Sequence, residues 1–374
     1  MLKYWLWLLN TSGVANYRNE RLINTFGNPY NIYKASKAEL LEKNLISSSE
    51  LNNFDNKDLS QAENVIKFCE KEKISIIPID DERFPENLKY ITPIPLVLFV
   101  KGHLLNLEKK LSIAMVGTRE CTKKGADFAY ELAFSLSKLD IPIVSGLAKG
   151  IDAAAHKGAL QAGGYTVAFL ANGVEFCYPS VNKNIYDVIA QNGAVISEFL
   201  PGAQPLRNHF PIRNRLISAL STGIAVIETE IRGGSIITAG FAGEQGRDLF
   251  AVPWNHDTPE GRGSAELIKS GAYPLCSYED IIEFYSGKYN IIKLPEKENN
   301  IKQEVSPQPP LITVSGSTDE EKIMSIIGNS PINISEISFK TGIPAAKIMP
   351  VLLTLEMEEK VIKLAGAYYI KCRN

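Results

Sequence analysis

Histidine and closely spaced cysteine are scarce in this 374-residue chain. It has four histidines, and its five cysteines include no C-x-x-C pair: Cys69, Cys121, Cys177, Cys276 and Cys372. An odd number of scattered cysteines fits neither a disulfide framework nor a zinc site and is typical of a reducing compartment. The histidines have no metal-ligand spacing either. We therefore expect no metal ion and a cytoplasmic location.

A strong net charge and long apolar runs are also missing. The formal net charge is -2, so any nucleic-acid site has to be a local patch on a nearly neutral protein. No run is long enough to cross a bilayer, so a membrane is not an expected partner. The apolar start of the chain is short, contains Lys3 and lacks a small-residue cleavage site. We interpret it as the first helix of a folded domain rather than a signal peptide.

Several motifs that mark common enzymes do not occur. The G-x-x-x-x-G-K-[ST] sequence of P-loop ATPases is missing, and no G-x-G-x-x-G follows a predicted strand, which argues against a dinucleotide coenzyme. No serine lies in the G-x-S-x-G turn that acyl transfer uses. We therefore expect no cofactor, no catalytic residues and no enzymatic activity.

What the chain does contain, from residue 76 to residue 286, is an alternation of apolar strands and helices. The predicted strands are residues 74–78, 96–100, 111–116, 141–145, 166–170, 194–197, 224–227 and 249–252. Near-continuous apolar strands with intervening helices indicate a parallel sheet covered on both faces. The prediction is an α/β fold with an extended, doubly wound, Rossmann-like sheet, whose ligands bind at the carboxyl ends of the strands.

Smaller parts flank this sheet. Residues 1–75 have the spacing of short helices, with Ser36 and Ser48 as helix N-caps, and resemble a helix-hairpin or sterile-alpha-motif-like module. Such a module serves either as an adaptor or simply for packing and dimerisation. Residues 287–317 are rich in proline and polar side chains and predict a linker.

The last segment, residues 318–374, predicts three helices followed by a hairpin that turns near Gly366. This is the pattern of a winged-helix domain. Its third helix contains Glu356, Glu358 and Glu359 and few cations, which fits poorly in a DNA major groove. Our hypothesis is that the domain binds protein or contacts duplex DNA only weakly.

Glycine-containing turns follow several of the predicted strands closely: 117–119, 146–152, 173 and 233–235. Glycine lets the backbone turn sharply and lets a ligand approach closely, and the helix expected after residue 233 adds the positive end of its dipole. One such turn is weak evidence by itself. Together with Arg119, Lys149, Arg213 and Arg215, the turns indicate an anionic ligand, most simply a phosphate.

One aromatic side chain stands out among these cations. Phe210 lies between His209 and Pro211 in a segment rich in arginine, where we expect it to stack on a base. The alternative is a hydrophobic plug beneath the loop. The pair Asp152 and His156 is better explained as a helix cap with a buried polar contact than as a catalytic dyad.

Taken in order, the motifs of the central section resemble the DNA-processing protein A family (DprA, also called Smf). They are the segments 116–119, 144–152 with 155–156, 178–179 with 182, 196–198, 210–217, 234–239 and 247–253. The resemblance covers the whole Rossmann-like section, while the flanking domains match in architecture alone. Thr118 stands where the family often has serine, and Trp254 where it commonly has glycine.

The resemblance implies a protein that binds single-stranded DNA, protects incoming DNA and loads the RecA recombinase onto it during natural transformation. It also implies a homodimer formed through the Rossmann-like domain. Combined with the turns above, it defines these candidate DNA-binding residues: Gly117, Thr118, Arg119, Lys149, Arg207, Phe210, Arg213, Asn214, Arg215, Gly234 and Ser235.

Two other functions compete with DNA binding. The fold also resembles nucleotide phosphoribohydrolases with a P-G-G-x-G-T-x-x-E segment, but here the glutamate after Gly234 is Glu244, too late for that spacing. Hydrolysis would then lack its general acid–base catalyst. A transcription factor acting through the winged helix is the other alternative, and the acidic third helix argues against it.

Overall fold

The computed structural model describes residues 1–42, 45–46, 50–255, 257–289, 318–328, 332–343, 345–358, 360–364 and 368–372. Contacts divide the chain into two compact units, Met1–Leu294 and Pro295–Asn374, which are described separately below. None of the helices in the described ranges has the length and apolar character needed to cross a membrane.

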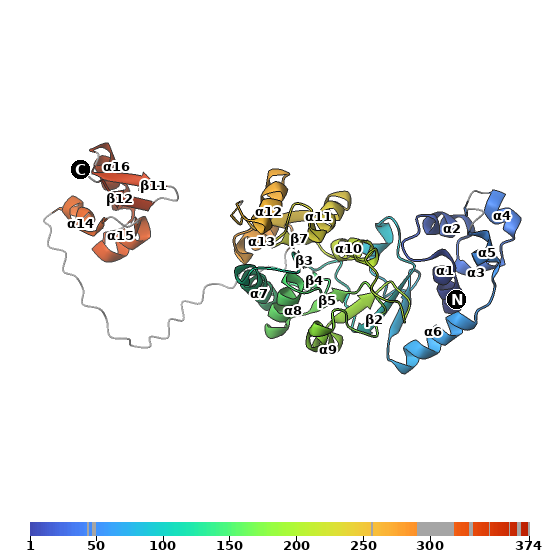
Figure 1. Ribbon diagram of the computed structural model, residues 1–374. Coiled ribbons are helices and arrows are strands. Elements are labelled where there is room, and N and C mark those ends of the chain that lie inside the picture. Colours follow the sequence, from blue (N-terminus) through green and yellow to red (C-terminus); the bar gives the residue numbers. More distant parts are fainter. Residues whose placement is uncertain are drawn as a thin grey trace. The chain divides into compact units, whose positions relative to one another are not determined.

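The first unit begins with short helices that pack on one end of a large sheet (Figure 1). They are α1 (Leu2–Ser12), α2 (Arg18–Phe26), α3 (Pro29–Lys34), α4 (Lys37–Glu42), α5 (Leu51–Asp55) and α6 (Ser60–Lys71). Trp5 and Leu8 share an apolar cluster with Val97 and Phe99 of the sheet, so the helices and the sheet have a common core. Ser36 caps α4 as predicted, through its hydroxyl and the Glu39 amide at 3.3 Å. The second predicted cap, Ser48, lies outside the described residues.

The sheet of the first unit confirms the predicted α/β class. Its strands are β1 (Ser75–Pro78), β2 (Val97–Gly102), β3 (Ile113–Val116), β4 (Ile143–Ser145), β5 (Thr166–Phe169), β6 (Ala194–Ser197), β7 (Gly223–Val226), β8 (Asp248–Ala251) and β9 (Tyr273–Pro274). Their order across the sheet is β1-β2-β6-β5-β4-β3-β7-β8-β9. The seven strands from β6 to β9 in this order are parallel to one another.

One end of the sheet differs from the parallel pattern. β1 pairs antiparallel with β2, and β2 pairs antiparallel with β6. The apolar character of a strand does not depend on its direction, so the sequence pattern could not reveal this reversal. Both outermost strands, β1 and β9, end in a proline, Pro78 and Pro274.

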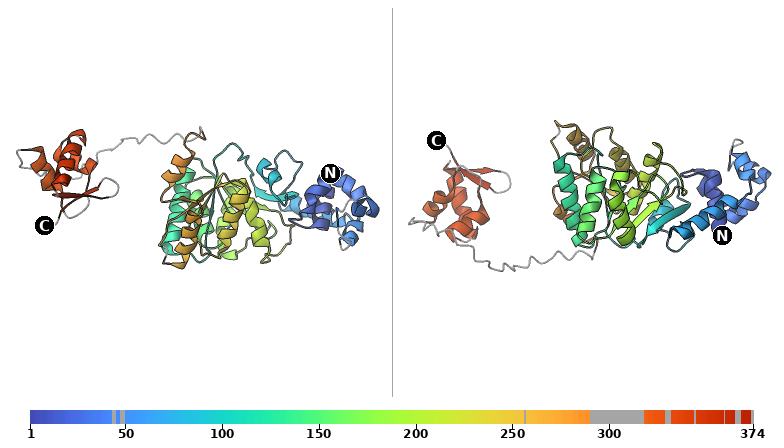
Figure 2. Two further views of the ribbon diagram at one scale, coloured as in Figure 1. Left: turned by 90° about the horizontal axis from the view of Figure 1, so that it is seen from above. Right: turned by 60° about the horizontal axis from the view of Figure 1, so that its bottom comes forward.

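Helices cover both faces of the sheet (Figure 2). They are α7 (Lys123–Lys138), α8 (Ile151–Gln161), α9 (Lys183–Asn192), α10 (His209–Leu220), α11 (Gly234–Glu244), α12 (Pro259–Lys269) and α13 (Tyr278–Tyr285), with short 3-10 turns η1 (Glu86–Tyr90) and η2 (Ser180–Asn182). Alternate residues of β3 point to opposite faces: Ile113 joins the cluster formed with α7 and α8, and Ala114 joins the cluster formed with α10 and α11. The sheet is therefore doubly wound, as predicted.

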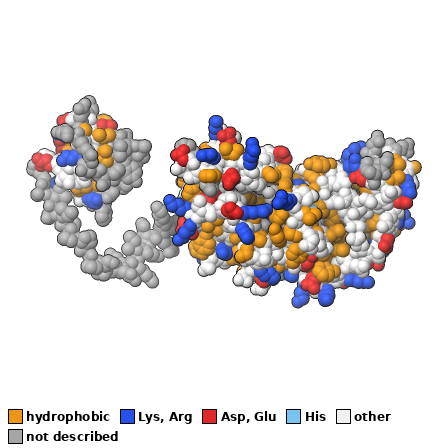
Figure 3. Space-filling model, in the orientation of Figure 1, with side chains coloured by type: hydrophobic (Ala, Val, Ile, Leu, Met, Phe, Trp, Pro, Cys, Tyr) orange, Lys and Arg blue, Asp and Glu red, His pale blue; other side chains and the backbone are white. Residues whose placement is uncertain are grey.

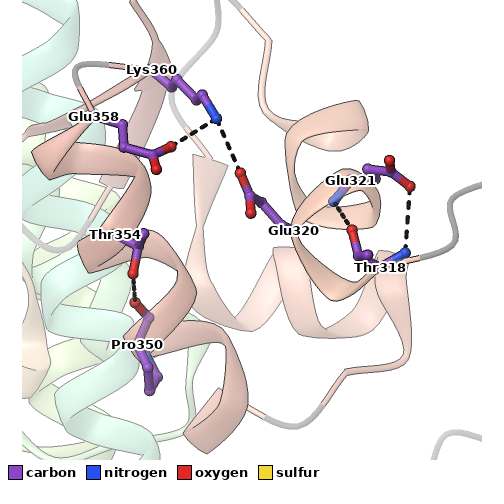
Figure 4. Close-up of polar contacts among 7 residues, drawn as sticks. All are labelled: Thr318, Glu320, Glu321, Pro350, Thr354, Glu358 and Lys360. Atoms are coloured by element: carbon purple, nitrogen blue, oxygen red, sulfur yellow. Dashed lines mark hydrogen bonds and ion pairs between the residues drawn. The ribbon is translucent and has the colours of Figure 1, made fainter.

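The second unit contains the three predicted helices and the two strands of the hairpin. They are α14 (Asp319–Ile326), α15 (Ile334–Thr341), α16 (Ala345–Met357), β11 (Val361–Leu364) and β12 (Tyr368–Lys371), and β12 also pairs with a short strand, β10 (Ile332–Asn333), that was not predicted. Thr318 and Glu321 form a capping box at the start of α14 (Figure 4). Lys360 pairs with Glu358 at 2.7 Å and with Glu320 at 3.1 Å. The turn near Gly366 and residues 290–317 of the predicted linker lie outside the described residues.

Candidate nucleic-acid interface

The candidate site lies where the order of the strands changes direction. From β3 the chain winds through β4, β5 and β6 on one side, whereas β7, β8 and β9 continue on the other side. Loops that leave β3 and β7 therefore separate, and this is the usual place for a ligand in a doubly wound sheet. A cavity of about 380 Å³ opens there, and Val116 at the end of β3 forms part of its wall.

The loop after β3 forms one wall of this cavity. The Thr118 amide donates to the backbone oxygen of Glu228 at 2.8 Å. The Glu228 carboxylate accepts from the Thr122 amide at 2.9 Å and from the Thr122 hydroxyl at 2.5 Å. A side chain at Gly117 would lie 2.5 Å from Ile151, so this position requires glycine. The loop is thus held at both ends, and Arg119 between them is exposed.

The loop after β4 is held by a buried carboxylate. Asp152 accepts from the amides of Gly146, at 3.1 Å, and Ala148, at 3.3 Å, and burial raises the pKa of its carboxyl group. His156 is fully buried and lies 2.8 Å from the Thr166 hydroxyl, and burial lowers its pKa to about 3. Both residues therefore make structural contacts, as we interpreted them, although Asp152 binds the loop before α8 instead of serving as its N-cap.

Phe210 lies in the first turn of α10, not in a loop as the sequence analysis assumed. Its ring is half-buried, and three side chains surround it. The guanidinium carbon of Arg119 lies 4.6 Å from the ring centroid, and that of Arg213 lies 6.0 Å from it. The Tyr178 ring centroid is 6.0 Å away. An aromatic ring flanked by cations at the mouth of a cavity is well suited to contact a base and its phosphate.

Arg213, the second cation beside the Phe210 ring, is buried. Its side chain is 4% exposed and donates to the backbone oxygens of Gly146, at 2.6 Å, and Phe169. Burial lowers the pKa of Arg213 to about 10, and the neighbouring Asp152 opposes that shift. The group remains a cation at neutral pH. Its donors bind the backbone at the ends of β4 and β5, and its charge lies beside the carboxyl group of Asp152, which lines the same cavity.

The start of α11 forms the opposite wall. Gly233, Gly234 and Ser235 line the cavity, and the Ser235 hydroxyl donates to Thr229 Oγ1 at 2.6 Å. The position of Gly234 is open, because no atom lies within 4 Å of where a side chain would begin. This confirms the predicted helix after the turn, whose positive dipole end faces the cavity wall.

Most of the candidate residues are brought together here. The cavity is lined by Gly117, Thr118, Arg119, Phe210, Arg213, Asn214, Gly234 and Ser235. Lys149 is exposed and lines an adjoining cavity of about 250 Å³, which shares Arg119, Phe210 and Arg213 with the first. Arg207 is exposed in the turn before α10 but lines neither cavity.

Arg215 does not belong to this surface, and its inclusion among the candidates was wrong. It is 1% exposed and pairs with Glu198 at 2.5 Å, and Glu198 is also buried. Successive helical residues turn by about 100°, so Arg215 points away from the side of α10 that carries Arg213. A DNA phosphate cannot reach a guanidinium that is enclosed in the protein and already paired.

The sequence analysis also missed several lining residues. Glu120 and Glu230 are exposed carboxylates at the cavity, and Thr229 and Thr238 are buried hydroxyls in its wall. Segment 234–239 of the family resemblance contained Thr238, but no motif singled out Glu120, Glu230 or Thr229, although Glu120 directly follows Arg119 in the loop. The cavity therefore presents a limited cationic area around Phe210 and is not uniformly basic.

Comparisons with known proteins agree with the architecture. The family model described as "DNA recombination-mediator protein A" matches residues 75–286, and the one described as "DprA winged helix domain" matches residues 305–367. The DNA processing protein DprA of Streptococcus pneumoniae is 38% identical over 274 residues, covering 68% of this chain and 96% of that protein. Protein Smf of Escherichia coli is 32% identical over 307 residues, covering 82% of this chain and 80% of that protein.

Solved structures give the same result. The structure of DNA processing protein A from Streptococcus pneumoniae superposes with a TM-score of 0.66 at 35% identity, covering 76% of this chain and 98% of that one. The protein from Helicobacter pylori, whose structure describes a single-stranded DNA binding mode, gives a TM-score of 0.53 at 27% identity and covers 58% of this chain and 99% of that one. With family models matching both its sheet and its winged helix, and with relatives above 30% identity over most of its length, this chain belongs to the DNA-processing protein A (DprA/Smf) family.

Proposed function

We propose that this protein binds single-stranded DNA in the cavity at the switch point of the sheet, and that it does so without cleaving the strand. The observation that carries the proposal is the position of Phe210, half-buried between the guanidinium groups of Arg119 and Arg213. The single-stranded DNA binding mode described for the Helicobacter pylori relative supports the same ligand.

Each part of the cavity has a matching part of a nucleotide. Phe210 stacks on an unpaired base, which contributes roughly 1–3 kcal/mol per base and tolerates any sequence. Arg119 neutralises a phosphate, and the N-terminus of α11 at Gly234 accepts another anionic group. Because a duplex keeps its bases stacked on one another, only an unpaired strand can place a base on this ring.

We further propose that the bound strand is protected and delivered to the RecA recombinase during natural transformation, and that the protein acts as a homodimer. Membership of the DprA/Smf family supports both parts. A few cations in each protomer give weak, salt-sensitive binding. Two such sites on one strand raise the effective affinity, because the second binding event becomes intramolecular.

Nucleotide hydrolysis is the competing activity, and the carboxylates of Glu120 and Glu230 at the cavity are the observation in its favour. The glutamate that comes nearest to the hydrolase motif, Glu244, is the last residue of α11, whereas the part of this helix that lines the cavity ends at Thr238. Glu244 therefore lies about 9 Å beyond Thr238 along the helix axis. Incubation with AMP should release no free adenine, and release of adenine would establish the enzyme instead.

The test of the proposed function is a comparison of single- and double-stranded oligonucleotides of equal length in a mobility-shift assay across salt concentrations. We expect the single strand to bind more tightly and its affinity to fall steeply as salt rises. Equal affinity for the two forms would contradict the role assigned to Phe210. An affinity that does not change with salt concentration would contradict the role assigned to Arg119.

A further inference from the structure

A groove between α7 and α8 adjoins the cavity proposed for DNA. It has a volume of about 510 Å³, and it lies beside η2. Small side chains, Ala153 and Ala154, form its floor, and the half-buried ring of Tyr130 forms one side. The exposed cations Lys149 and Lys157 line it as well. No residue of this groove except Lys149 was among the candidates from the sequence.

The groove lies near the cavity at the switch point, and the adjoining cavity lies between them. The first cavity and the adjoining one share Arg119, Phe210 and Arg213. The adjoining cavity and the groove share Lys149. Together they define one path that starts at α11, passes the ring of Phe210 and ends between α7 and α8. A flexible strand that leaves Phe210 in this direction meets Lys149 next.

The composition of the groove suits the same ligand. Within the described part of the chain, neither Lys149 nor Lys157 takes part in an ion pair, so both are free to neutralise phosphates. Tyr130 and the exposed Val181 offer apolar surface for a base, and Asp127 is the acidic residue in the lining. Figure 3 shows Lys and Arg side chains on the part of the first unit formed by the sheet and its helices, interspersed with Asp, Glu and apolar ones.

We propose that the α7–α8 groove is a second segment of the DNA site. A strand held at Phe210 continues over Lys149 and places its next nucleotides against Tyr130 and Lys157. This inference rests on the proposed function. It adds a length dependence: a short oligonucleotide fills the region around Phe210, and a longer one also reaches the groove.

The test compares binding of fluorescent oligothymidines of about 6 and about 20 nucleotides to the full-length protein, lengths chosen around the 4–16 nucleotides that such binding surfaces commonly span. Lys157→Glu should weaken binding of the long strand about tenfold and change the affinity for the short strand by no more than about twofold. The reason is that it replaces a positive charge by a negative one in the groove, which the short strand does not reach. Lys109→Glu is the matched control. Lys109 is also exposed but precedes β3, so it lies toward the amino ends of the parallel strands, away from the groove.

A charge-independent variant, Tyr130→Leu, keeps an apolar side chain in the groove and removes the ring. It should also weaken the long strand alone, by about fivefold or more. If neither Lys157→Glu nor Tyr130→Leu weakens binding of the long strand more than Lys109→Glu does, the groove is not part of the DNA site. If the unaltered protein does not bind the short strand either, then the site at Phe210 is wrong, and so is the proposed function.

Discussion

Two arginines of α10 lie two positions apart and face different parts of the molecule. Arg213 lies under the DNA cavity, next to Phe210 and the loop at Gly146. Arg215 lies in the interior and pairs with Glu198, which also accepts a hydrogen bond from the backbone of Ala15 in the turn between α1 and α2. One helix therefore separates a surface that is open to a ligand from a buried contact that joins the helices to the sheet.

The difference teaches that residue type alone does not assign a role. Both side chains are guanidinium groups, yet one supplies charge to a cavity and the other neutralises an enclosed carboxylate. Burial raises the pKa of Glu198, while Arg215 opposes that shift. The predictions below separate the two sides by asking which variants unfold the protein and which only release DNA.

The largest effect is expected on the buried side. Arg215→Ala leaves the Glu198 carboxylate enclosed without its partner, which should lower the free energy of unfolding by about 3–5 kcal/mol. Urea denaturation followed by circular dichroism measures this loss. The double variant Glu198→Leu/Arg215→Leu should recover most of it, because neither charge then remains buried. A loss below about 1 kcal/mol for Arg215→Ala would contradict the importance of the pair.

Substitutions at the cavity should weaken DNA binding rather than unfold the protein. Phe210→Ala and Arg119→Ala should each weaken binding of a 20-nucleotide single strand by roughly 1–3 kcal/mol, about five- to 150-fold, through lost stacking or lost phosphate contact. Their unfolding free energies should change little, because Arg119 is exposed and Phe210 is half-buried.

Fluorescence anisotropy over a range of salt concentrations measures both variants. Arg119→Ala should also reduce the slope of log affinity against log salt by about 1, whereas Phe210→Ala should leave the slope unchanged. Lys109→Ala serves as the control for loss of an exposed cation elsewhere. If both variants bind the strand with wild-type affinity, the cavity is not part of the DNA site.

A smaller effect concerns acid stability on the buried side. Burial lowers the pKa of His156 from its ordinary value of 6.5 to about 3 in the folded protein, so the unfolded state binds more protons between these values. Stability must then fall as the pH drops below 6.5. Between pH 7.5 and 5.5 the wild type should lose about 1 kcal/mol more than His156→Gln. Parallel stability curves for the two proteins would show that the imidazole is not enclosed in this way.

The smallest effect is expected from the winged helix. Its α16 exposes Met349 and Leu353, which are 51% and 60% exposed, and has Glu356 next to its last residue. Removing residues 290–374 should therefore change single-stranded DNA affinity by no more than about twofold. A mobility-shift titration of the truncated protein measures this. A large loss would move part of the DNA site into the second unit.

Much of the fold could be predicted because it follows from periodicity. The strands β3 to β8 are short apolar runs, and the turns after β3 and β7 contain glycine at positions where a side chain has little room or where the surface must stay open. The switch point brought Gly117, Arg119 and Gly234 together as the parallel arrangement requires. The direction of β1 and β2 was not available from these patterns.

The role of the arginines near Phe210 could not be predicted without knowing where α10 begins. The sequence analysis treated the segment around Phe210 as a loop, in which Arg213 and Arg215 could point the same way. Since α10 already starts at His209, residues two positions apart differ by about 200° around its axis. Tyr178 reaches the Phe210 ring from the loop before η2, and no local spacing in the sequence records that proximity.

The prolines at the two margins of the nine-stranded sheet limit how this protein can aggregate or assemble. Pro78 ends β1 and Pro274 ends the two-residue strand β9, and proline has no amide hydrogen to offer a neighbouring strand. Growth of the sheet from one molecule into the next is therefore disfavoured. Copies of the first unit that associate are therefore expected to use helix surfaces and side chains rather than the margins of this sheet.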